Sequence, residues 1–328
     1  MKNFFKLLVL FLFSCHSLLY AKENDLHEMK KACRKGDPDK CYNAGVIFSS
    51  GKGVPIDDKK ALYFFKKSCK EKVFQGCYNV AVMIENGRGT EKNVDKAAEY
   101  FAKSCEGGVA QACLNIGVMH ADGAGVAQDN KKALNFFKRS CSEEFTGGCY
   151  NAGLMYVIGK GVEKDDGKAL GFFHKACRGG TSAGCYNVGL MYAFGRGVAE
   201  NKKKAVAFLK KACEKGSAEG CYNAGVMYAG GEGVDINQKQ AEIYFEKACE
   251  AGFRVVCNKD VVKKYIDENR LIYLELKEKC DTDLKWLKRV HEYCSENECG
   301  SELKKRWNIT VKQYNEECSR FTGTLFED

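Results

Sequence analysis

The hydrophobic pattern of this chain predicts short amphipathic helices that return at a fixed interval. Over residues 149–158, apolar side chains recur three and four positions apart, which is the spacing of one helix face. Gly159 and Gly161 follow and indicate the end of this helix. Asp165 then supplies a residue that favours the start of a second helix. The segment 149–184 therefore predicts one helix–turn–helix unit.

The same unit recurs every 36 residues in six full copies, from residue 41 to residue 256. The second helix of each copy carries an alanine and, three positions later, an aromatic residue. The alanines are Ala61, Ala97, Ala133, Ala169, Ala205 and Ala241, and the aromatic residues are Phe64, Tyr100, Phe136, Phe172, Phe208 and Tyr244. We interpret the alanines as small residues that let helices approach closely, and the aromatic column as core packing between neighbouring repeats, because one helical hairpin cannot bury its apolar face alone. The predicted fold is all-α: an α/α solenoid superhelix with a concave side.

Fourteen of the nineteen cysteines follow the same interval, as pairs eight residues apart. On one continuous helix such a pair would be separated by about 12 Å, whereas a disulfide needs Cα atoms within about 7 Å. A bonded pair therefore requires the chain to reverse between its two cysteines, and most of the intervening segments contain glycine. We predict one disulfide per repeat, joining the end of one helix to the start of the next. The pairs are Cys33–Cys41, Cys69–Cys77, Cys105–Cys113, Cys141–Cys149, Cys177–Cys185, Cys213–Cys221 and Cys249–Cys257.

Metal binding is the alternative use of these thiols. Zinc sites favour thiols two to four residues apart together with a second such pair or histidines. The chain has five histidines, and no two of them have ligand spacing on a helix. His120 takes the position that Tyr156, Tyr192 and Tyr228 occupy in other copies, so we interpret it as a packing residue. We expect no metal site and no cofactor.

The two ends of the chain differ from the repeats. Residues 1–21 resemble a secretory signal peptide, with an apolar run from Leu7 to Phe13 that is too short to span a bilayer. We therefore expect a secreted or periplasmic protein that is not transmembrane; lipoprotein anchoring at Cys15 is the alternative. An exported location also agrees with disulfides.

Residues 22–40 are interpreted as an N-terminal capping half-repeat, and residues 257–328 as a terminal half-repeat followed by a helical C-terminal cap. The C-terminal region holds four further cysteines, whose pairing the sequence leaves open among three arrangements. They are Cys280, Cys294, Cys299 and Cys318.

The formal net charge is +9, and lysines crowd the second helix of the repeats, as at Lys66–Lys67 and Lys210–Lys211. One interpretation is a solvated helix face. The other is attraction to an acidic partner such as an anionic glycan or lipid. Nucleic acid is not expected, because no base-stacking or groove-reading motif accompanies the charge.

An asparagine stands two residues after the second cysteine of every full copy. Asparagine is a poor residue for a helix interior, so its recurrence needs a cause. A column of amides could pair with an extended peptide backbone in the concave groove. Alternatively, each amide ties its helix to the adjacent repeat or caps a turn. The candidate peptide-binding residues are Asn43, Asn79, Asn115, Asn151, Asn187 and Asn223.

The repeated pattern Ala…Gly-x-x-Tyr…Gly-x-Gly-Val…Lys-Ala…Phe resembles the Sel-one-like repeat, a relative of the tetratricopeptide repeat. With its added Cys-x7-Cys element, the chain is similar to the helicobacter-type cysteine-rich protein family over about residues 22–262. The resemblance implies an exported α/α solenoid with one disulfide per repeat. It also implies penicillin binding and weak β-lactam hydrolysis, but no family motif transfers a catalytic residue to this chain.

Serine β-lactam enzymes combine Ser-x-x-Lys, Ser-x-Asn and Lys-Ser/Thr-Gly elements. Ser49 and Ser301 each precede a lysine by three positions, and Ser295 precedes Asn297 by two, but the third element is absent. The catalytic residues therefore stay unknown. Our leading hypothesis is an exported, disulfide-stapled scaffold that binds peptides or cell-wall components. Its partner would be a peptide or protein, or a peptidoglycan-related molecule. A weak β-lactamase that takes small β-lactams is the alternative.

Overall fold

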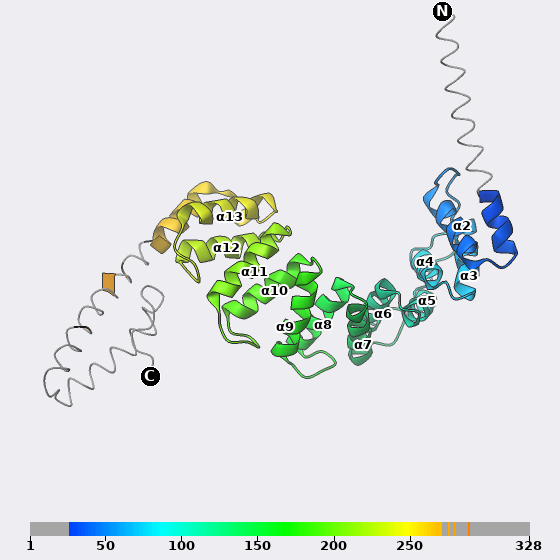
Figure 1. Ribbon diagram of the computed structural model, residues 1–328, viewed down its shortest axis with the longest axis horizontal. Coiled ribbons are helices and arrows are strands. Elements are labelled where there is room, and N and C mark those ends of the chain that lie inside the picture. The colour runs from blue at the N-terminus through cyan, green and yellow to red at the C-terminus, as the bar shows by residue number, and fades with distance from the viewer. Residues whose placement is uncertain (1–25, 271–274, 276–277, 280–287, 289–328) are drawn as a thin grey trace, which may run out of the picture. The chain divides into compact units, whose positions relative to one another are not determined.

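The computed structural model describes residues 26–270 and, beyond them, residues 275, 278, 279 and 288 (Figure 1). The chain divides into two compact units, Met1–Gly179 and Gly180–Asp328. Helices joined by short turns make up the described residues, as the all-α prediction required. The expected signal peptide at 1–21 and the four C-terminal cysteines lie outside these residues.

The first unit begins with a helix at residues 26–34, which is followed by pairs of antiparallel helices. We call the first helix of each pair the A helix and the second the B helix. The A helices are α2 (Pro38–Ser50), α4 (Phe74–Glu85), α6 (Ala110–Asp122) and α8 (Thr146–Ile158). The B helices are α3 (Asp58–Lys70), α5 (Val94–Glu106), α7 (Asn130–Ser142) and α9 (Asp166–Arg178).

The second unit repeats this arrangement. Its A helices are α10 (Ser182–Ala193) and α12 (Ala218–Gly230), and its B helices are α11 (Lys202–Glu214) and α13 (Gln238–Glu250). A 3-10 turn, η1 (Arg254–Cys257), follows α13, and a further helix is described over residues 259–270. Within each unit, an A helix packs against its own B helix, and that B helix packs against the next A helix.

Side chains at the helix ends explain where each helix starts and stops. Every B helix begins after an aspartate or asparagine whose side-chain oxygen accepts the backbone N–H three residues later, at 2.8–3.0 Å. Such a cap satisfies a donor that has no partner inside the helix. Four A helices end at a glycine with φ between 66° and 79°, the left-handed conformation that glycine adopts without strain. Both signals agree with the sequence prediction.

The chain reverses between the cysteines of each described pair, as the eight-residue spacing required. Cys69 lies at the end of α3 and Cys77 in the first turn of α4, with Cα atoms 4.6 Å apart. The same geometry recurs at Cys33–Cys41, Cys105–Cys113, Cys141–Cys149, Cys213–Cys221 and Cys249–Cys257, with Cα separations of 4.5–5.0 Å. Cys177 and Cys185 are disulfide-bonded as well. The fold therefore has one disulfide per repeat, each worth about 2.5 kcal/mol in the chain-entropy treatment of so short a loop.

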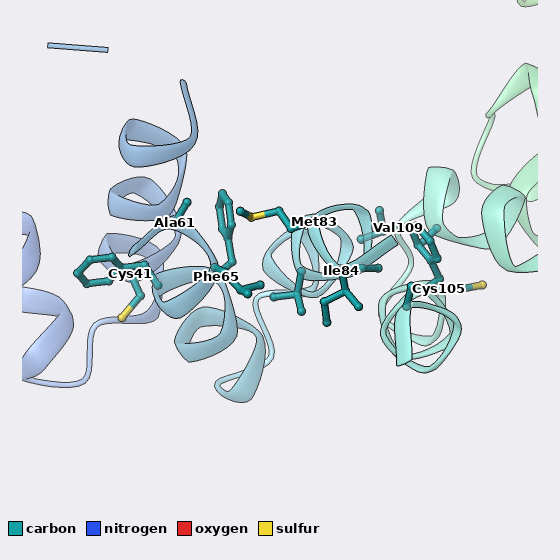
Figure 2. Close-up of a cluster of buried hydrophobic side chains, with 14 of the residues drawn as sticks. Cys41, Ala61, Phe65, Met83, Ile84, Cys105 and Val109 are labelled. Carbon is teal, nitrogen blue, oxygen red and sulfur yellow. The ribbon is translucent and has the colours of Figure 1, made fainter. Parts of the chain in front are cut away.

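Clusters of buried side chains lie between the A and B helices of each unit. Figure 2 shows part of one cluster in the first unit, where Ala61, Phe65, Met83 and Ile84 are buried together with the disulfide cysteines. All six alanines of the predicted column are fully buried, which lets the helices approach closely.

The aromatic column behaves differently from the prediction. The side chain in the middle of the core belongs to the residue that follows the predicted aromatic residue in the sequence. It is Phe65, Phe101, Phe137, Phe173 or Phe245 in five copies and Leu209 in the other. Of the predicted rings, Phe64 and Tyr244 are also buried and the other four are half-buried, and five of the six stack on a ring in the last turns of their own A helix. Tyr156 and Phe172, for example, stack with centroids 5.6 Å apart. The ring stacking of this column thus joins two helices of one repeat, whereas the prediction placed the packing of these rings between neighbouring repeats.

In four of the A–B turns, the second glycine lies in close contact with the backbone of the preceding repeat. Gly125 has φ of 70°, and a Cβ atom built there would lie 2.6 Å from the carbonyl oxygen of Val94, in the first turn of the preceding B helix. Gly89, Gly161 and Gly233 approach the preceding B helix in the same way. Backbone therefore packs directly on backbone at these turns, which no residue with a side chain could match.

The regular stacking ends after α13. Glu242 is exposed at the position where earlier copies bury an apolar residue, such as Leu134 or Val206. The next A helix is also interrupted, because η1 ends at Cys257 and Asn258 caps a new helix by accepting the backbone N–H of Asp260 at 3.0 Å. A pocket of about 460 Å³ lies between α13 and this new helix, with Phe245, Val256 and Val262 among the lining residues. A polar outer face is what a terminal repeat needs.

Candidate functional site

The six asparagines of the candidate site all lie on A helices. Asn43 is exposed and the other five are half-buried, so each amide reaches the surface. In each unit, one pair of A helices from successive repeats also makes contact, α6 with α8 and α10 with α12. The structure therefore places the asparagines of neighbouring repeats on adjacent helices.

In the second unit, the amide nitrogens are partly occupied by bonds within the protein. The Nδ2 group of Asn187 donates to the carbonyl of Ala183 at 2.9 Å, and that of Asn223 donates to the carbonyl of Glu219 at 2.9 Å. Asn223 also donates to the hydroxyl of Tyr186, on the preceding A helix, at 3.4 Å. Burial raises the pKa of the Tyr186 phenol, and the hydrogen bond from Asn223 opposes that shift. At this position, then, the amide does tie two repeats together.

In the first unit, no side-chain hydrogen bond to another described residue engages the asparagine amides. This holds for Asn43, Asn79, Asn115 and Asn151. Their donors and acceptors face water in the absence of a ligand, so a ligand could use them without breaking an internal bond. The structural interpretation of the column therefore applies at Asn223, whereas the amides of the first unit have no internal side-chain partner among the described residues.

A second column lies beside the asparagines, which the sequence did not single out. Three residues after each asparagine stands a valine or leucine that remains partly exposed, with 37% of Val46 and 39% of Val118 accessible to solvent. The column comprises Val46, Val82, Val118, Leu154, Leu190 and Val226. Residues three apart on a helix share a face, so the amide and the aliphatic side chain are neighbours in every copy.

Within each unit, we call these two columns together the A-face. In the first unit, its best-connected part is formed by Asn115 and Val118 on α6 with Asn151 and Leu154 on α8, because these two helices contact one another. Exposed Ile158 extends the apolar part of α8. Amides beside partly exposed aliphatic side chains can offer hydrogen bonds to a peptide backbone and apolar contacts to its side chains.

The residues considered for catalysis are not brought together in the described part of the chain. Ser49 lies in the last turn of α2, where its Oγ donates to the carbonyl of Val46 at 3.0 Å. Ser295 and Ser301 lie outside the described residues. His120 stacks on Phe136 with ring centroids 5.5 Å apart and a 9° angle between the planes, so it packs as expected.

The described residues lack two further kinds of feature. No group of three histidine, cysteine, aspartate or glutamate side chains there is arranged to hold a metal ion. No described helix combines the length and the apolar character that crossing a bilayer requires.

Solved structures with the same repeat architecture resemble this chain. A Sel1 repeat protein from Oxalobacter formigenes is 26% identical, with a TM-score of 0.62, and the match covers 72% of this chain and 68% of that one. A protective antigen of uropathogenic Escherichia coli strains, which displays an SLR fold, is 22% identical with a TM-score of 0.68 over 88% of this chain. This chain spans 64% of that protein's length, just under two thirds, and the likeness shows the fold alone.

The cysteine-rich protein B of Helicobacter pylori is 34% identical over 40% of this chain and 93% of its own, with a TM-score of 0.33. A search among curated proteins finds no match. The Sel1 repeat, a unit of scaffolds typical of protein–protein interaction, matches six consecutive segments: 41–72, 75–109, 110–144, 147–181, 182–217 and 218–253. Because these segments cover more than half of the sequence, the chain belongs to the Sel1 repeat family, as the resemblance in its motifs had indicated.

Proposed function

We propose that this protein is an exported scaffold that binds an extended peptide segment of a partner, or a peptide-containing cell-wall component, along its A-face. The aliphatic column is the observation that carries the proposal. Six valine and leucine side chains remain partly exposed on successive A helices, each beside an asparagine. Single exposed apolar residues are ordinary, but the same position exposed in successive repeats forms a periodic surface within each unit.

The backbone groups of an extended peptide would pair with the asparagine amides, and its side chains would contact the valines and leucines. Hydrogen bonds to the backbone give affinity without reading sequence, whereas apolar contacts select side chains. The disulfides support this role because they hold each B helix to the next A helix and so limit the rearrangement that binding would otherwise cost. Export is proposed from the N-terminal sequence and from the oxidised cysteines.

Selection from a display library of random twelve-residue peptides on the oxidised protein would supply a probe, and fluorescence anisotropy would measure its Kd. Val118→Ser with Leu154→Ser should weaken binding by about 10-fold or more, since two buried aliphatic contacts are worth about 1–2 kcal/mol or more together. Asn115→Ala with Asn151→Ala should weaken it by about 5- to 100-fold, because two hydrogen bonds are lost.

A matched control replaces exposed residues of the B helices in the same unit, Glu99→Ala with Asn135→Ala. This variant should bind as the unmodified protein does. Selected peptides whose Kd is unchanged by both A-face variants would refute the proposed surface. If the asparagine variant left the Kd unchanged while the valine and leucine variant raised it, the amide column would be structural and the aliphatic column alone would bind.

A further inference from the structure

The B helices carry a basic pattern that peptide binding on the A-face does not use. In each of the first five repeats, a lysine, an aromatic residue and a second basic residue stand at positions i, i+4 and i+7, which lie on one face of a helix. The sets are Lys60–Phe64–Lys67, Lys96–Tyr100–Lys103, Lys132–Phe136–Arg139, Lys168–Phe172–Lys175 and Lys204–Phe208–Lys211. The sixth repeat has Gln240, Tyr244 and Lys247. We call this pattern the B-stripe.

Acidic neighbours offset only part of this charge. The first lysine pairs with the aspartate that caps its helix in three repeats, with Nζ–Oδ2 distances of 2.8 Å for Lys60, 3.8 Å for Lys132 and 2.9 Å for Lys168. The other two repeats have asparagine as the cap, so Lys96 and Lys204 lack this counter-charge. Among the described residues, no ion pair engages the second basic position of any B helix. Counted over its own positions and the helix caps, the B-stripe therefore keeps a positive surplus in every repeat, while α5 and α13 carry further carboxylates outside these positions, such as Glu99 and Glu246.

Lysines of neighbouring repeats also converge on the same aromatic ring. Lys138 on α7 and Lys168 on α9 place their Nζ atoms 5.3 Å and 5.7 Å from the ring centroid of Tyr156. Lys30 and Lys60 both lie 5.5 Å from the ring centroid of Phe48. The rings hold these ammonium groups in place by cation–π attraction. Lys60 and Lys168 are each paired with the aspartate that caps their helix, so Lys30 and Lys138 are the lysines beside these rings that have no ion pair among the described residues.

We propose that the B-stripe is a binding surface for a linear anionic glycan. Its charges repeat from one B helix to the next within each unit, and this suits a polymer that carries charge along its length. A lipid bilayer is the less suitable partner. The rings of the B-stripe are buried or half-buried beneath the lysines, so they offer no apolar side chain for insertion among lipids.

Neutralising part of the B-stripe tests this proposal with heparin, a sulfated glycan, as the probe. Lys96→Gln, Lys103→Gln and Lys175→Gln would be combined in the full chain, since all three side chains are exposed and lie on α5 and α9. A control of equal charge combines Lys52→Gln, Lys92→Gln and Lys160→Gln, which are exposed in the A–B turns of the same unit. Circular dichroism and free-thiol counts would establish that both variants are folded and oxidised.

The slope of log Kd against log salt counts the ionic contacts that form on binding. The B-stripe variant should lose roughly 2–3 from this slope, or about one per lysine, whereas the control should lose less than about 1. Equal losses in the two variants would show attraction by net charge only and overturn the proposal, as would an unchanged slope in both. Binding to phosphatidylglycerol vesicles that exceeds binding to heparin would also overturn it, in favour of a membrane surface.

Discussion

Replacing Gly125 by alanine should uncouple two neighbouring repeats. The new Cβ atom would lie 2.6 Å from the carbonyl oxygen and 2.7 Å from the carbonyl carbon of Val94. Both are backbone atoms of the first turn of α5, so the turn or the helix must move. Overpacking of this kind costs about 1–3 kcal/mol. The positive φ of 70° adds strain of about 1–2 kcal/mol for any residue with a Cβ atom.

Gly108 supplies a matched control for the strain. It has φ of 86°, and nothing lies within 4 Å of a Cβ atom built there. The change in the free energy of unfolding caused by Gly108→Ala therefore includes the backbone strain and the reduced entropy of the unfolded chain, but not the contact with the preceding repeat. We expect Gly125→Ala to be the less stable of the two by about 1–3 kcal/mol, which is the contact contribution alone.

Urea unfolding of the oxidised protein, followed by far-ultraviolet circular dichroism, would compare the two variants. Repeat arrays need not unfold in one step, so the transition midpoints and the hydrogen exchange of the first turn of α5 would be read together. Gly125→Ala should lower the midpoint further and speed exchange in that turn. Equal midpoints and equal exchange for both variants would show that the backbone contact at Gly125 does not hold the repeats together.

Three further predictions concern charge, sulfur and catalysis. Hydrogen bonds from the side chain and the backbone N–H of Lys168 lower the pKa of Asp165, so its carboxylate stabilises the fold above about pH 4, and this contribution is lost as the pH falls. Asp165→Asn should therefore flatten the acid limb of a plot of the unfolding midpoint against pH. An unaltered plot would contradict the reasoning. When the protein is treated with limiting dithiothreitol, alkylated and analysed by mass spectrometry, the Cys249–Cys257 disulfide should be reduced first. The reason is that Cys257 is exposed, whereas both cysteines are buried in the disulfides Cys33–Cys41, Cys69–Cys77, Cys105–Cys113, Cys141–Cys149 and Cys213–Cys221. Reduction of the disulfides in random order would contradict this. With a chromogenic cephalosporin, Ser49→Ala should leave any turnover unchanged, because the Ser49 hydroxyl donates to a backbone carbonyl, and abolished turnover would refute that view.

The helical architecture could be predicted because its signals are local. The eight-residue spacing of Cys69 and Cys77 forces a chain reversal by distance alone. Asp165 caps a helix by bonding to an N–H only three residues away. Such features depend on a few consecutive residues, which a single sequence displays in full.

The contacts between helices could not be predicted in the same way. Gly125 is the equivalent of Gly161, so the sequence predicts that it follows the end of a helix. Its contact with Val94 lies between two repeats, and the residues around Gly125 in the sequence do not reveal it. Phe136 and Phe137 are adjacent and chemically identical, so only the packed structure shows that Phe137 fills the core while Phe136 lies at its edge. Val118 looks like a core residue from its helical spacing, and its exposure depends on how the repeats stack.

Site-specific photo-crosslinking tests the central claim, that partners bind on the A-face, most directly. Benzoylphenylalanine would replace Val118 on α6 or, as the control, exposed Asn135 on the B helix α7. Irradiation with a bound selected peptide should cross-link that peptide to the probe at position 118 and leave the probe at position 135 unreacted. Equal cross-linking from both positions, or cross-linking from position 135 alone, would contradict binding on the A-face.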